Sequence, residues 1–95
     1  MRVPDLSKHP DKCPIVIRTN SKNLPQVIPE KFLVHKKATI GKLIAILRNK
    51  INIPSFYCIF LSCENTILKQ TDFIQNIYDR FHRPDGFLYF EYFEQ

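Results

Sequence analysis

The chain has 95 residues, which is enough for one domain with a modest hydrophobic core. Its longest unbroken apolar runs, residues 43–47 and 57–61, fall far short of the ~20 residues that a membrane-spanning helix needs, and residues 1–11 are too polar for a signal peptide. The net charge of +5 is unevenly spread: residues 1–50 carry 11 Lys or Arg against three acids (+8), and residues 51–95 carry three against six (−3). The basic half predicts either a solvated face or contact with a nucleic acid, a membrane surface or an acidic peptide.

The sequence lacks the residue patterns of an enzyme or a metalloprotein. Gly41 and Gly86 are the only glycines, so a Gly-rich phosphate-binding loop cannot be formed. The three histidines belong to no recognisable catalytic set, and His9 and Cys13 lack two further ligands at a spacing that suits zinc. We therefore expect no enzyme activity, no catalytic residue, no metal site and no cofactor, which leaves a binding module.

The cysteines indicate a reducing compartment. The chain has an odd number of cysteines, Cys13, Cys58 and Cys63, and no two of them form a C-x-x-C motif. Because Cys58 and Cys63 are five residues apart in a predicted strand, their side chains point to opposite faces and cannot easily form a disulfide. We expect three buried thiols in a cytoplasmic protein.

The first half of the chain predicts two strands and a helix. Residues 15–17 are a β-branched run after Pro14, and residues 32–34 form a second short strand, so the two make a hairpin with a long loop. Thr39 is suited to begin a helix, and Pro54 ends it. The helix presents one apolar stripe at i, i+3, i+4, i+7 and i+11, formed by Ile40, Leu43, Ile44, Leu47 and Ile51, with Ile46 off that stripe.

The second half predicts a further strand pair, a helix and a last strand. Residues 57–63 indicate a strand that is covered on both faces, and residues 67–68 a short extended segment. A second helix begins at Gln70 or Thr71, with Phe73, Ile74, Ile77, Tyr78 and Phe81 on one side. After a turn at residues 83–86, residues 87–93 form the most apolar strand, which we expect at the centre of the sheet.

This order predicts an α+β fold in which a small sheet grips one crossing helix, as in the ubiquitin-like β-grasp. We expect a mixed sheet of four to five strands, a central crossing helix and a second short helix. No composition break divides the chain, so residues 1–95 are expected to form one domain.

Several short motifs, in register from residue 8 to residue 92, resemble one family. They are K-H-P-D-K-C-P-I-V-I (8–17), K-F-L-V (31–34), T-I-G (39–41), Asn65-Thr66, Ile77-Tyr78 and D-G-F-L-Y (85–89). The chain is thereby similar to the ubiquitin-like autophagy modifiers, the autophagy-related protein 8 family, which includes microtubule-associated protein light chain 3 and the GABA-receptor-associated protein. The resemblance implies a cytoplasmic adaptor for autophagosome formation and cargo recruitment, whose partners are autophagy receptor and adaptor peptides.

The resemblance also implies the residues that bind a peptide with an acidic-aromatic-x-x-aliphatic pattern. The strand at residues 31–34 is expected at a sheet edge, where an extended peptide can pair with it. A first pocket for the aromatic residue would be lined by Pro14, Val16, Lys31, Leu33 and Phe87. A second pocket for the aliphatic residue would be lined by Phe32, Val34, His35, Leu43 and Ile46. The acidic residues would contact Lys12, Lys31 and Lys50.

Three positions depart from the family's usual residues around the second pocket. His35 stands where Pro is usual, Ala38 where Leu is frequent and Leu43 where an aromatic residue is common. These departures predict a wider and less aromatic second pocket. Lys12 and Lys50 stand where Arg is frequent, which removes bidentate pairing with a carboxylate.

The two ends of the chain bear on the second implied function, conjugation to phosphatidylethanolamine. Family members are activated by conjugation enzymes through a C-terminal Gly, carry lipid as lipoproteins, and then reside on autophagosome or vesicle membranes. This sequence ends Y-F-E-Q and holds no conjugation Gly, so either the tail lies outside it or this member is not lipidated. Residues 1–11 are expected to be a remnant of the family's N-terminal helices, which would leave Phe87, Tyr89 and Phe93 less covered.

Two other functions remain as alternatives. Tyr57, Phe60 and Phe87 beside lysines could stack bases in a small basic RNA-binding domain, although no RNA-binding signature is present and no nucleic acid is expected. A ubiquitin-like scaffold outside autophagy could instead bind microtubules or vesicle cargo through its basic half.

Overall fold

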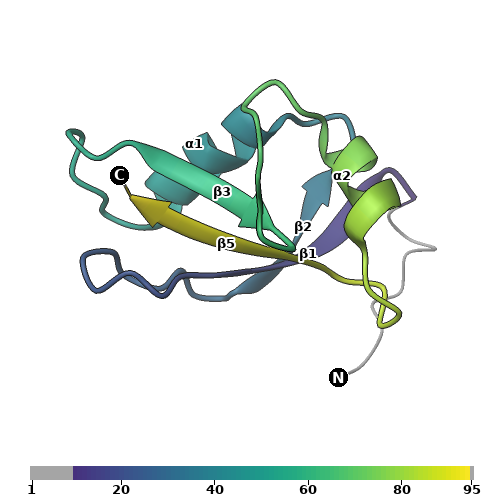
Figure 1. The fold of residues 1–95 in the computed structure, drawn as a ribbon, viewed down its shortest axis with the longest axis horizontal. Coiled ribbons are helices and arrows are strands. Elements are labelled where there is room, and N and C mark those ends of the chain that lie inside the picture. Colours follow the sequence, from purple (N-terminus) through teal and green to yellow (C-terminus); the bar gives the residue numbers. More distant parts are fainter. Residues whose placement is uncertain (1–9, 95) are drawn as a thin grey trace.

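A five-stranded sheet and two helices make up the computed structural model, which describes residues 10–94 (Figure 1). In chain order the elements are β1 (Lys12–Arg18), β2 (Lys31–His35), α1 (Ile40–Lys50), β3 (Ile59–Cys63), β4 (Thr66–Ile67), α2 (Ile74–Phe81) and β5 (Leu88–Glu94). The strand order is β2-β1-β5-β3-β4, with β1 parallel to β5 and the other pairs antiparallel. The predicted α+β architecture, the mixed sheet and the central last strand are confirmed.

Helix α1 forms where the apolar stripe predicts it. Thr39 caps its N-terminus, since Thr39 Oγ1 accepts a hydrogen bond from the Lys42 N–H at 3.2 Å. Ile40, Leu43, Ile44 and Leu47 are buried, and Arg48 and Lys50 lie in the last turn, where the helix dipole favours cations. The helix ends at Lys50, before the expected stop at Pro54.

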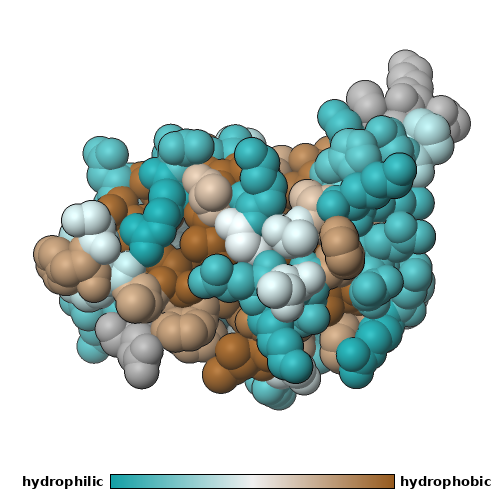
Figure 2. All heavy atoms as spheres, turned by 90° about the horizontal axis from the view of Figure 1, so that it is seen from above, coloured by the Kyte–Doolittle hydropathy of each residue, from teal (hydrophilic) through white to brown (hydrophobic). Residues whose placement is uncertain are grey.

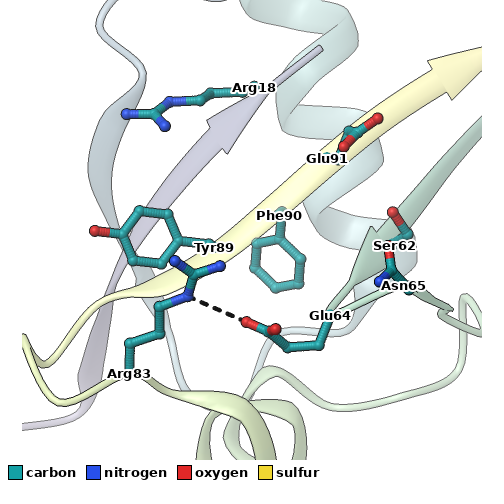
Figure 3. Close-up of a pocket in the computed structure, with 8 residues that line it drawn as sticks. All are labelled: Arg18, Ser62, Glu64, Asn65, Arg83, Tyr89, Phe90 and Glu91. Atoms are coloured by element: carbon teal, nitrogen blue, oxygen red, sulfur yellow. Dashed lines mark hydrogen bonds and ion pairs between the residues drawn. The ribbon is translucent and has the colours of Figure 1, made fainter. Parts of the chain in front are cut away.

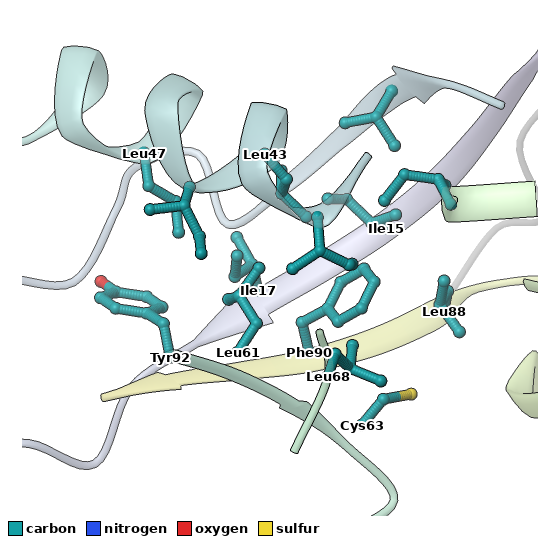
Figure 4. Packing of buried hydrophobic residues seen from close by; sticks show 14 of the residues in the cluster. Ile15, Ile17, Leu43, Leu47, Leu61, Cys63, Leu68, Leu88, Phe90 and Tyr92 are labelled. Carbon is teal, nitrogen blue, oxygen red and sulfur yellow. The ribbon is translucent and has the colours of Figure 1, made fainter. Parts of the chain in front are cut away.

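The hydrophobic core lies between α1 and one face of the sheet (Figure 4). Ile15 and Ile17 of β1 and the alternating residues Leu88, Phe90 and Tyr92 of β5 point into it. Tyr92 is fully buried, and its hydroxyl accepts from the Val27 N–H at 3.0 Å and donates to the Pro25 carbonyl. This contact fastens the long β1–β2 connection to the sheet, and burial raises the pKa of Tyr92.

Strand β3 differs from its prediction in length and in cover. It begins at Ile59 rather than at residue 57, because the chain turns after Pro54 and the Tyr57 N–H donates to the Pro54 carbonyl at 3.1 Å. Ile59, Leu61 and Cys63 are buried, whereas Phe60 and Ser62 are half-buried, so only one face is fully covered. Cys58 lies before the strand and is exposed, so the expectation of three buried thiols is wrong for Cys58.

Helix α2 begins at Ile74, three or four residues later than predicted. The preceding residues turn at Gln70 and Thr71 and contact the start of α1: the Gln70 carbonyl accepts from Gly41 N–H and the Asp72 carbonyl from Ile40 N–H, both at 2.9 Å. They therefore satisfy N–H groups that the first turn of a helix leaves free. Phe73, expected on the apolar side of the helix, is 48% exposed because it precedes α2 with an extended backbone and pairs with Thr39.

Most of the expected N-terminal remnant, residues 1–9, lies outside the described residues; Pro10 and Asp11 form a turn before β1. Neither described helix has the length and apolar character needed to cross a membrane.

Candidate functional site

Strand β2 is an outer strand of the sheet, and β1 is its one neighbouring strand in the described part of the chain. Leu33 lies opposite Pro14, and Lys31 opposite Val16, in the antiparallel register of the two strands. An outer strand leaves one row of N–H and C=O groups without a neighbouring strand. An extended peptide can therefore add to this edge as a further strand.

A pocket of about 200 Å³ opens beside this edge, on the sheet face away from α1. Four residues of the expected first pocket line it, Pro14, Lys31, Leu33 and Phe87, together with Phe32. Val16 is fully buried next to them and lies outside the main core cluster. The Asp85 carboxylate accepts a hydrogen bond from the Phe87 N–H at 2.9 Å, which fixes the backbone position of Phe87 at the side of the pocket.

The residues expected around the second pocket line no common pocket among the described residues: Val34 of β2 packs in the core with Leu43 of α1, and His35 follows at the end of β2. Val34 is 4% exposed and Leu43 1%, and both belong to the main core. Phe32 and Ile46 are half-buried. His35 is exposed; its Nε2 lies 3.2 Å from Asp11 Oδ2 and its Nδ1 accepts from the Lys37 N–H.

The expected ligand-binding cations border the same edge. Lys31 and Lys50 are exposed and Lys12 is half-buried. None of the three takes part in an ion pair within residues 10–94. The Lys50 ammonium lies 5.1 Å from the centre of the Phe32 ring, so it covers part of the second pocket's surface.

A second charge arrangement adjoins the start of β2. Glu30 precedes Lys31 and accepts two hydrogen bonds from the Arg18 guanidinium, at 3.0 and 3.3 Å. Arg18 thereby lowers the pKa of Glu30 and keeps its charge paired. Lys31 also lowers the pKa of Glu30, but it forms no ion pair with this carboxylate.

A polar pocket of about 290 Å³, which the sequence did not predict, lies on the sheet face away from α1 (Figure 3). Arg83 pairs there with Glu64 at 3.1 Å and stacks 4.4 Å from the centre of the Tyr89 ring. The Tyr89 hydroxyl donates to Asp85, which lowers the pKa of Asp85 and raises that of Tyr89. Its residues come from four separate segments, and no local sequence pattern joins them.

The described residues offer little to metal or thiol chemistry. No group of three or more His, Cys, Asp or Glu within residues 10–94 could hold a metal ion. Burial raises the pKa of Cys13, and raises that of Cys63 to about 11, so both thiols are protonated at neutral pH.

Comparison with known proteins decides the family. The family model "Autophagy protein Atg8 ubiquitin like" matches residues 5–95. The chain belongs to the Atg8 family. Among curated relatives, Arabidopsis thaliana autophagy-related protein 8c is 30% identical over 86 residues, which cover 90% of this chain and 72% of the relative. Members of the family are ubiquitin-like modifiers that act in autophagy.

Solved structures support the same assignment of this Atg8-family chain. Trypanosoma brucei ATG8 matches with a TM-score of 0.89 at 26% identity, covering 95% of this chain and 78% of that one. Plasmodium falciparum Atg8, solved in complex with a P. falciparum Atg3 peptide, matches with a TM-score of 0.78 at 33% identity, covering 93% and 80%. The ubiquitin-like fold implied by the sequence motifs is confirmed.

Proposed function

We propose that this Atg8-family protein binds receptor and adaptor peptides of the acidic-aromatic-x-x-aliphatic pattern along β2. The observation that carries the proposal is the 200 Å³ pocket beside the outer edge of β2. A peptide strand paired with β2 places successive side chains on alternate faces of the sheet. Its aromatic residue can therefore enter the pocket of Pro14, Leu33 and Phe87 while its backbone bonds to β2.

Positive charge along β2 contributes to the selectivity for peptides with acidic residues. Lys31 lines the first pocket and forms no ion pair with any residue between 10 and 94, so an acidic residue beside the aromatic can reach it. Lys12 and Lys50 extend the positive charge on either side of β2. Exposed pairs of this kind each contribute about 0.5–1 kcal/mol and mainly affect the association rate.

The aliphatic residue of the peptide is proposed to rest on Phe32, His35 and Ile46. Because Val34 and Leu43 are core residues, this second subsite is shallow in the free protein. Its contribution to affinity is expected to be smaller than that of the first pocket, since less apolar surface can be covered.

The proposed role is recruitment of cargo receptors during autophagosome formation, in the cytoplasm and, where a lipid is attached, at the autophagosome membrane. Conjugation-enzyme peptides are a second proposed class of partner. The support for that class is the relative from P. falciparum, whose structure contains an Atg3 peptide.

An NMR titration of the ¹⁵N-labelled protein with such peptides tests the proposal. We expect shifts at β2 and around Phe87, and a Lys31→Glu variant that binds about tenfold more weakly, because a favourable charge contact becomes repulsive. Lys69→Glu is the matched control: it makes the same charge change after β4, at the other edge of the sheet, and should alter binding less than about twofold. Absence of shifts with every peptide of the panel contradicts the proposal.

A further inference from the structure

The side of α1 that faces β3 carries a hollow that the proposed peptide edge does not use. It has a volume of about 460 Å³ and lies between α1 and the segment that enters β3. Its α1 wall follows the helical spacing i, i+3, i+4 and i+7 and consists of Gly41, Ile44, Ala45 and Arg48. Residues 55 and 57–60 and Gln70 form the other walls. Its volume is within the range of ligand-binding sites.

Short side chains on α1 explain why the space stays open. Gly41 contributes no side chain and Ala45 a single methyl group, so the helix surface is low between them. The Gly41 N–H donates to the Gln70 carbonyl at 2.9 Å, which holds the segment after β4 at the end of the hollow. Figure 2 views the molecule from above and shows hydrophobic side chains at the surface between hydrophilic ones.

Arg48 gives the hollow its charge. Arg48 is half-buried and its Nη2 donates to the Tyr57 carbonyl, but it forms no ion pair within residues 10–94. Arg48 is the one charged residue among those that line the hollow, and no Asp or Glu lies in that lining. A guanidinium has five N–H donors, so Arg48 retains several that can bind a carboxylate. The local charge therefore favours an anionic ligand group.

An exposed aromatic residue extends the surface beyond the hollow. Phe56 is 78% exposed, and its ring lies 4.7 Å from that of Tyr57, which lines the hollow. Aromatic residues and Arg are enriched at the centres of protein interfaces. A free small carboxylate could fill the hollow but would leave Phe56 in water, so the combined surface favours a polypeptide.

We propose that this hollow is a second docking site, for a partner segment that sets an aliphatic side chain against Ile44 and Ala45 and a carboxylate on Arg48. Phe56 then packs against the outer side of the segment. The site is on the opposite flank of α1 from Ile46 and Lys50, and it does not depend on the peptide edge at β2.

The test uses a capped hexapeptide that contains one Glu and one Leu and no aromatic residue. In an NMR titration we expect weak binding, with shifts confined to residues 41–48, 55–60 and 70. A peptide with Gln in place of Glu should bind about fivefold more weakly, because it loses the charge-assisted hydrogen bonds to Arg48. Octanoate is titrated in parallel as a free aliphatic carboxylate.

Two variants of α1 distinguish binding in the hollow from a nonspecific effect of added negative charge. Ala45 is exposed and lines the hollow, so Ala45→Glu places a carboxylate three residues before Arg48 and should weaken peptide binding about fivefold while the fold is kept. Asn49→Glu adds the same charge to α1 at an exposed position outside the lining and should change binding less than about twofold. Lys31→Glu should leave this binding intact, which distinguishes the hollow from the β2 edge.

Three outcomes overturn the proposal. The first is an absence of shifts in the hollow at millimolar peptide, and the second is equal binding of the Glu and Gln peptides or of the Ala45→Glu and Asn49→Glu variants. The third is binding of octanoate without binding of the peptide, which would make the hollow a small-molecule site rather than a docking surface.

Discussion

The two faces of β2 differ in how much of their surface a ligand can reach. On the face away from α1, Leu33 and Lys31 border an open pocket together with Pro14 and Phe87. On the α1 face, Val34 is almost fully covered by the core that α1 completes. The same alternation along one strand therefore supplies a ligand pocket on one side and core packing on the other.

The difference shows that a helix packed on one face of a sheet determines which strand side chains a ligand can contact and which are buried in the core. Leu43 of α1 is in the core with Val34, whereas Ile46, on the helix surface three residues later, remains half-buried. Of the two expected peptide pockets, the first is therefore open in the free protein and the second is shallow. Substitutions on the two faces should consequently affect different quantities, one the affinity for peptides and the other the stability of the fold.

The largest expected effect is the loss of stability in Leu43→Ala. Because Leu43 is 1% exposed in the core, we expect the free energy of unfolding to fall by about 3 kcal/mol. Ile46→Ala, on the same helix and in the same expected pocket, should cost about 1 kcal/mol, since Ile46 is half-buried. Equilibrium urea unfolding measures both, and equal small losses would show that Leu43 is a surface residue of an open pocket.

The spacing of apolar residues along the sequence was sufficient to predict those helices and strands in which buried residues recur at a regular interval. The stripe on α1 and the apolar strand at residues 87–93 were both readable from the sequence. The start of α2 was not, because residues 70–72 bind the first turn of α1, about 30 residues away in the sequence. Cys58 was misplaced for a similar reason, since the turn after Pro54 delays β3 until Ile59.

The next effect concerns affinity for a peptide of the proposed pattern. Leu33→Ala removes part of the first pocket's wall, and we expect the dissociation constant to rise about tenfold. Ile46→Ala is the comparison on the α1 face, with an expected rise of about twofold to threefold because the second subsite is shallow. Isothermal titration calorimetry of both variants measures which dissociation constant rises more. A larger rise in Ile46→Ala would show that the second subsite contributes more to affinity than the first pocket.

Four of the residues that the family motifs indicate for the first pocket lie together in the fold, whereas the depth of the second pocket could not be predicted. The family motifs led to Pro14, Lys31, Leu33 and Phe87, which line one pocket. The departures at His35, Ala38 and Leu43 predicted a wide second pocket, yet a sequence cannot show that α1 packs closely enough to cover Val34. The polar pocket around Arg83 and Tyr89 was missed because four segments meet there only in the folded chain.

The smallest effect is a pH dependence on the open face, where Asp85 accepts from the Phe87 N–H and from the Tyr89 hydroxyl. The pKa of Asp85 is lowered, so its contribution to stability is present above its ordinary value of 3.8 and is lost as the pH falls through the lowered pKa. The pKa of Tyr89 is raised, so its contribution is present below 10.0 and is lost as the pH rises through the raised pKa.

Tyr89→Phe should therefore lower stability slightly and uniformly between about pH 5 and pH 9, with the difference from the unsubstituted protein shrinking below pH 3.8. An NMR titration of the carboxyl carbons should show the Asp85 pKa rising toward its ordinary value in this variant. Glu30, whose pKa is lowered by Arg18, is the internal control and should not change. If the Asp85 pKa is the same in both proteins, the hydroxyl of Tyr89 does not stabilise that carboxylate, and Phe87 is held by Asp85 without help from Tyr89.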